Sequence, residues 1–106
     1  MSLNVHGWFI GPQRFIKEAK THNHDWHTEQ GRDNTISLFA IKVISATSRF
    51  NAHVDLESIR TKGGRLLFIV IEARTDVDPI PAPDPEVVEK VAEYMELEGE
   101  PVWDAL

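Results

Sequence analysis

The most continuous apolar stretch of the chain is Arg65–Ala73, RLLFIVIEA, where six apolar residues follow one another from Leu66 to Ile71. β-Branched and aromatic side chains dominate this stretch, two glycines precede it and charged residues follow it. A short apolar run with these boundaries is typical of a strand buried on both faces. We therefore expect the rest of the chain to cover a central strand at this position.

Two earlier segments also show strand-like patterns. Apolar and polar residues alternate imperfectly over Leu3–Ile10, which predicts a first strand. Ile36–Ser45, ISLFAIKVIS, is mostly apolar at both its odd and its even positions. This pattern predicts a second strand with two apolar faces.

The segment Arg49–Thr61 fits two structures. Apolar residues alternate from Ala52 to Leu56 as in a strand, and KGGR at residues 62–65 would form a tight hairpin into the central strand. A helix also fits, with Asn51 as its cap and the glycine pair as its terminator. The hairpin is favoured because the histidine and valine in the middle of the segment slightly disfavour a helix.

Helical patterns occupy two further segments. Gln13–Thr21 follows a Gly-Pro pair, and Pro12 suits the first helical position because an N–H there would have no partner. A second helix follows the proline-rich stretch Val77–Pro85, which is expected to run extended. Asp84 is expected to cap this helix and Gly99 to end it.

The elements are expected in the order β-α-β-(β)-β-α. The simplest fold is α+β, a small two-layer sandwich with a mainly antiparallel sheet, ferredoxin-like or related. Residues 1–76 would form the core, 77–85 an extended Pro-rich linker, and 86–106 an acidic C-terminal helix and tail packed on the core or on a partner subunit. Small sheets often leave a face or an edge bare, and a homodimer would cover it.

Length and composition exclude several classes of protein for this chain. A chain of 106 residues indicates one domain. The absence of cysteine excludes disulfides, thiolate metal sites and cysteine nucleophiles. No apolar run approaches the roughly 20 residues needed to span a bilayer, so we expect no membrane segment and a cytoplasmic location.

The net charge of −6 is unevenly distributed. Residues 1–74 carry ten Lys/Arg and seven Asp/Glu, a net charge of +3, whereas residues 75–106 carry ten Asp/Glu and only Lys90, a net charge of −9. A small positive excess without a binding motif argues against a nucleic-acid partner. The acidic segment suggests contact with a basic protein, although a solvated helix face would have the same composition.

The polar segment His22–Thr35, HNHDWHTEQGRDNT, is expected to be a loop and carries the best candidate for chemistry. Its possible metal ligands are His22, His24 and His27, with Asp25, Glu29 and the more distant His53 as additional candidates. Imidazole and carboxylate groups are ligands that zinc and other divalent metals prefer. An ordinary solvated loop fits the same residues.

No nucleophile elbow, phosphate loop or dinucleotide fingerprint is found in the chain. The sequence therefore favours a non-catalytic binding or regulatory module that self-associates or contacts a basic partner. The alternative is a small enzyme or ligand-binding domain whose pocket lies between sheet and helices, with the histidine-rich segment 22–29 at its mouth.

Overall fold

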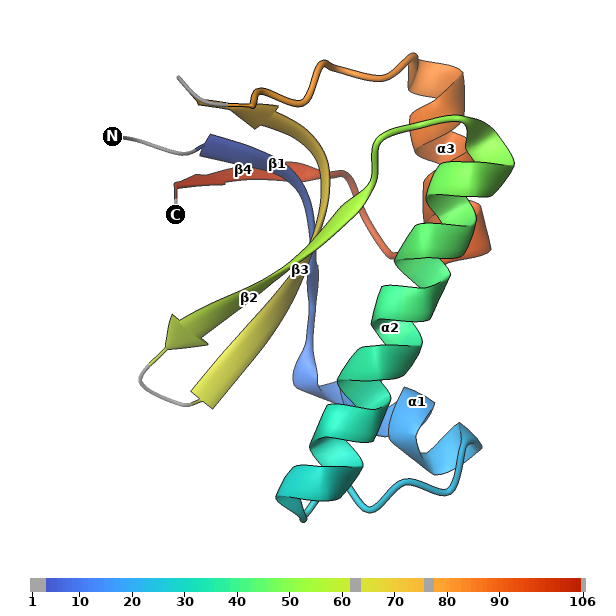
Figure 1. Cartoon of the computed structure of the whole chain (residues 1–106), viewed down its shortest axis with the longest axis vertical. Helices are drawn as coiled ribbons and strands as arrows, with labels where there is room; N and C mark the ends of the chain where they lie inside the picture. Colours follow the sequence, from blue (N-terminus) through green and yellow to red (C-terminus); the bar gives the residue numbers. More distant parts are fainter. Residues whose placement is uncertain (1–3, 62–63, 76–77, 106) are drawn as a thin grey trace.

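Seven helices and strands follow one another in the computed structural model, which describes residues 4–61, 64–75 and 78–105. They are β1 (Asn4–Ile10), α1 (Pro12–Thr21), α2 (Glu29–Phe50), β2 (Asp55–Thr61), β3 (Gly64–Arg74), α3 (Pro85–Tyr94) and β4 (Val102–Ala105). The three helices lie together on one side of the described sheet (Figure 1). The protein is thus a two-layer α+β sandwich, as the sequence predicts.

The described sheet has the strand order β2-β3-β1-β4, and each neighbouring pair of strands is antiparallel. Together α1 and α2 connect β1 to β2, and α3 lies between β3 and β4 along the chain. When the two helices of the first connection are taken as one unit, the order is β-α-β-β-α-β. This is the connectivity of ferredoxin-like sandwiches.

The main hydrophobic core lies between the sheet and the helices. Its buried residues are Trp8, Ile10, Phe39, Val43, Ala46, Val54, Leu67, Ile69, Ile71, Val91 and Met95. The prediction of a central strand buried on both faces is confirmed, because no residue from Leu67 to Ile71 is more than 4% exposed. Strand β3 therefore pairs with a neighbour on each edge and packs on each face.

The segment Ile36–Ser45 is helical, so the prediction of a strand there is wrong. It belongs to α2, in which Thr35, Phe39 and Val43 are buried at a spacing of four residues. Side chains four apart share one face of a helix. The outer face of α2 also carries apolar residues, including Ile44 at 70% exposed. Apolar residues on both faces mask the helical period, which explains the error.

The first end of α2 corrects the bounds of the predicted loop, and its other end contradicts the less favoured helix alternative for the segment that follows. Thr28 caps the N-terminus of the helix, because its hydroxyl accepts a hydrogen bond of 3.0 Å from the N–H of Gly31. The predicted loop His22–Thr35 is therefore shorter than expected and ends at this cap. Asn51, in the left-handed conformation with φ of 49°, ends α2 and does not begin a helix.

The strand alternative for the segment before the central strand is confirmed. Strand β2 pairs with β3 from Asp55↔Val70 to Thr61↔Gly64. This register leaves two residues for the connection, as the predicted hairpin requires. Those two residues, Lys62 and Gly63, lie outside the described part of the chain.

Helix α3 begins as predicted, with Pro85 in its first turn. The side chain of Asp84 makes no capping hydrogen bond, and the helix ends at Tyr94, several residues before the predicted terminator Gly99. The chain then returns as β4 to pair with β1. Within the described ranges, no helix is long and apolar enough to cross a membrane.

Candidate functional site

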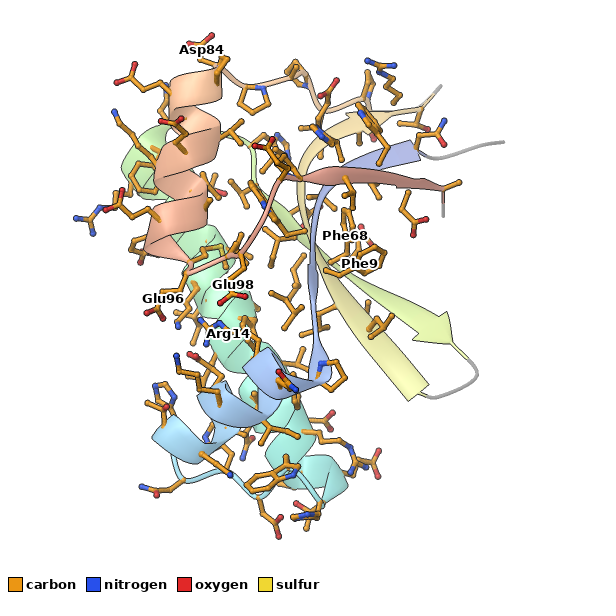
Figure 2. All side chains as sticks on the ribbon, turned by 180° about the vertical axis from the view of Figure 1, so that it is seen from behind. Phe9, Arg14, Phe68, Asp84, Glu96 and Glu98 are labelled. Carbon is orange, nitrogen blue, oxygen red and sulfur yellow. The ribbon has the colours of Figure 1, made fainter. Side chains whose placement is uncertain are left out.

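The face of the sheet opposite the helices carries a cluster of apolar residues, and we call it the open face. It carries Val5, Phe9, Phe68, Val70, Ala73 and Val102. Two of these assignments follow from the strand register, because directly paired residues of antiparallel strands share a face: Phe9 is opposite Phe68, and Val102 is opposite Gly7. Figure 2 shows Phe9 and Phe68 on the side of the sheet away from the helices.

Phe68 forms the floor of the open face and is fully buried. One edge of its ring, Cε1, lies 3.1 Å from the position that a Cβ on Gly7 would occupy. The ring of Phe9 meets Phe68 edge to face, with 4.7 Å between the ring centroids. Phe9 and Val102 remain 42% and 46% exposed. These two side chains are therefore the exposed large apolar residues of the open face.

Two carboxylates border the open face on β2. Asp55 pairs with Val70, and Glu57 pairs with Phe68, so both acids lie on the same face as the apolar residues. Burial raises the pKa of the Glu57 carboxyl above its ordinary value, and the negative charge of Asp55 raises it further. An ionised Glu57 is therefore unfavourable at this position.

Glu57→Gln is expected to raise the free energy of unfolding at neutral pH. Because the pKa of Glu57 is raised by folding, the folded state holds its proton more tightly, and the wild type loses stability as the pH rises from about 4.5 through the higher folded value. Glutamine avoids this loss. Urea denaturation at several pH values measures the effect, which should vanish in acid. Glu93→Gln, at an exposed position of α3, is the control, and an equal gain there would contradict the explanation.

The three histidines of the predicted metal site each have a different partner. Nδ1 of His22 donates to the backbone oxygen of Glu18 at 3.1 Å, and Nδ1 of His27 donates to Asp25 at 3.0 Å. Nδ1 of His24 donates to the hydroxyl of Thr35 at 3.2 Å, which itself donates to a backbone oxygen. Each ring therefore keeps Nε2 as its acceptor nitrogen.

Of the remaining candidate ligands, Asp25 contacts one of these rings, that of His27. Hydrogen bonds from the backbone and ring of His27 lower the pKa of Asp25. Glu29 begins α2, whereas His53 follows its other end, about 33 Å away along the helix axis. Among the described residues, no three His, Asp or Glu side chains are close enough to hold a metal ion. The zinc site stays a prediction, to be tested by zinc titration of wild type and His24→Ala.

Acidic side chains surround α3 and the turn that follows it. Asp84, Glu86, Glu89, Glu93, Glu96, Glu98 and Glu100 are all exposed, and Figure 2 marks three of them. Glu96 contacts a cation of α1, with 3.4 Å between its Oε2 and Nη2 of Arg14. This surface is on the helical layer, opposite the open face. Its contact with a basic protein stays a prediction.

Neither Phe9 nor Val102 is among the site residues predicted from the sequence. The alternation of Val5, Gly7 and Phe9 on one side of the first strand was a usable signal for Phe9. The signal for Val102 was the apolar group Pro101, Val102 and Trp103 at the end of the acidic segment, which the sequence predicts to pack on the core or on a partner subunit. Comparisons of the chain with protein-family models, curated proteins and solved structures find no match.

Proposed function

We propose that the protein is a non-catalytic binding module that acts as a homodimer, with two copies packed through their open faces. The supporting observation is the pair of exposed apolar side chains, Phe9 and Val102, beside the buried ring of Phe68 on a sheet face without helices. An apolar sheet face is normally covered by a second layer. In this proposal, the second copy supplies that layer.

A second copy suits this face for geometric reasons. Phe9 and Val102 lie on the neighbouring strands β1 and β4, so the exposed pair lies toward the β4 edge of the sheet, next to Phe68 on β3. A two-fold axis there would place the open face of one copy against the same face of the second copy, as in isologous dimers. Two sheets packed face to face interdigitate such side chains. The acidic α3 surfaces would then point outward on both sides, free to contact a basic protein.

The oligomeric state tests this proposal directly. Wild type is expected to sediment at twice the chain mass of 12.0 kDa. Phe9→Lys combined with Val102→Lys is expected to raise the dimer dissociation constant at least about a hundredfold, because charged ammonium groups would replace the apolar side chains at the centre of the contact and lose their hydration. Analytical ultracentrifugation over a range of concentrations measures both quantities, and circular dichroism verifies that the variant is folded.

Ile44→Lys is the matched control. Ile44 is also a large exposed apolar residue, but it lies on the outer face of α2, on the helical side of the molecule. The dimer should persist in this variant. A monomeric wild type, or a dimer lost in Ile44→Lys and kept in the double variant, would reject the open face as the interface.

A further inference from the structure

A bulge in β3 brings two consecutive side chains to the same side of the sheet. The pairing of β1 with β3 passes from Gly7↔Val70 to His6↔Glu72, so Ile71 has no residue opposite it. Successive side chains of a regular strand point to opposite faces, yet Ile71 and Glu72 both line one cavity. Bulges redirect side chains in this way and are frequent beside functional sites.

The bulge places Glu72 beside His6. Nδ1 of His6 lies 3.5 Å from Oε1 of Glu72, and both side chains are largely buried. On its other edge, His6 pairs with Trp103 of β4, whose ring stacks on the imidazole with 4.6 Å between centroids. A carboxylate can only accept hydrogen bonds, so Glu72 favours the tautomer with the proton on Nδ1. Nε2 of His6 then remains as an acceptor.

The cavity in front of this pair has a volume of about 400 Å³, which is within the range of small-molecule sites. Its apolar walls come from β1, α3 and the two proline-containing segments on either side of α3: Trp8, Pro83, Val88, Ala92 and Pro101. The indole N–H of Trp8 is already engaged, donating to the backbone oxygen of Gly99 at 3.2 Å. Binding here would therefore depend on apolar contact and on a few polar side chains.

With the proton of His6 on Nδ1, the polar side chains that face the cavity with a free hydrogen-bonding group are all hydrogen-bond acceptors. They are His6, Glu72, Glu89 and Glu100, with no lysine or arginine among the lining residues. A bound molecule must supply the donor, and an anion would meet three carboxylates. This chemistry is independent of the open face, which lies on the other side of the sheet.

We propose that this cavity binds a small, mainly apolar, uncharged or cationic molecule that donates a hydrogen bond from a hydroxyl or amine to Nε2 of His6. Three probes that share a para-methylphenyl ring and differ in their polar group test this proposal. They are para-cresol, para-methylanisole, which lacks the donor, and para-toluate, which is an anion. Binding is followed by the amide shifts of Val88 and Ala92 in nuclear magnetic resonance spectra, and the ring of His6 is followed in the same titration.

The expected result is saturable binding of para-cresol, with para-methylanisole about tenfold weaker because one hydrogen bond is lost. Para-toluate should bind more weakly than either. His6→Phe preserves an aromatic ring against Trp103 and should abolish the preference for the cresol, whereas His53→Phe, at an exposed position between α2 and β2, should keep it. The proposal is overturned by no saturable shift in wild type, by equal binding of cresol and anisole, or by a preference for toluate.

Discussion

Gly7→Ala is expected to lower the free energy of unfolding by about 3 kcal/mol, the upper end of the usual range for overpacked sites. A Cβ on Gly7 would overlap the carbonyl oxygen of Ile69 and press on the ring of Phe68. The carbonyl is part of the backbone, so it cannot move aside without disturbing the pairing of β1 with β3. Urea denaturation followed by circular dichroism measures the loss.

Gly11→Ala is the control for this substitution. Gly11 precedes α1 with φ of −70°, a value that alanine adopts readily, and a Cβ there would meet no atom within 4 Å apart from its own neighbours in the chain. The free energy of unfolding of Gly11→Ala should differ from that of wild type by less than about 1 kcal/mol. Equal losses in the two variants would show that close backbone approach at Gly7 is not the reason for a glycine there.

Glu18→Gln is expected to lower the free energy of unfolding by about 2–3 kcal/mol, as for removal of one member of a largely buried ion pair. The Glu18 side chain is 5% exposed and contacts two cations: Nη1 of Arg14 lies 2.7 Å from Oε2, and Nζ of Lys42 lies 2.6 Å from Oε1. These contacts join α1 to α2. Without the carboxylate, both cations remain partly buried: Lys42 loses its ion-pair partner, and Arg14 keeps its contact with the exposed Glu96. Denaturation at neutral pH measures the effect.

The Glu18 carboxylate should stabilise the folded protein as the pH rises, whereas the Glu57 carboxylate should destabilise it over the same change. Burial alone would raise the pKa of Glu18, but the hydrogen bonds and charges of Lys42 and Arg14 outweigh it, so the pKa lies below its ordinary value. The stabilisation is therefore complete above about pH 4.5 and is lost as the pH falls through the lower folded value. The difference between wild type and Glu18→Gln should shrink in acid.

Glu86→Gln provides a matched control for the buried ion pair. Glu86 also pairs with a cation four residues away, with 3.5 Å between Oε1 and Nζ of Lys90, but both side chains are more than half exposed. Solvent screens such pairs, so the expected loss is below about 0.5 kcal/mol. A Glu18→Gln loss no larger than this would mean that the buried cluster does not stabilise the contact between α1 and α2.

The sequence by itself determined those elements whose signals are local. The apolar run around Phe68, the alternation in β1 and the prolines that begin α1 and α3 each depend on a few neighbouring residues. All four elements form in the predicted segments, although α3 ends before the predicted Gly99. The two-layer α+β class followed from these elements. The homodimer, the basic partner and the zinc site remain predictions of the sequence.

The tertiary structure determined the features that depend on contacts between segments distant in sequence. α2 has apolar residues on both faces, so its own period did not identify the buried side; packing of Phe39 and Val43 against the sheet did. Strand register decided which residues meet across the sheet. His6 and Glu72 are distant in sequence, and a single bulged residue, Ile71, brings them together. Such pairings depend on where two strands align, and no pattern within either strand encodes that alignment.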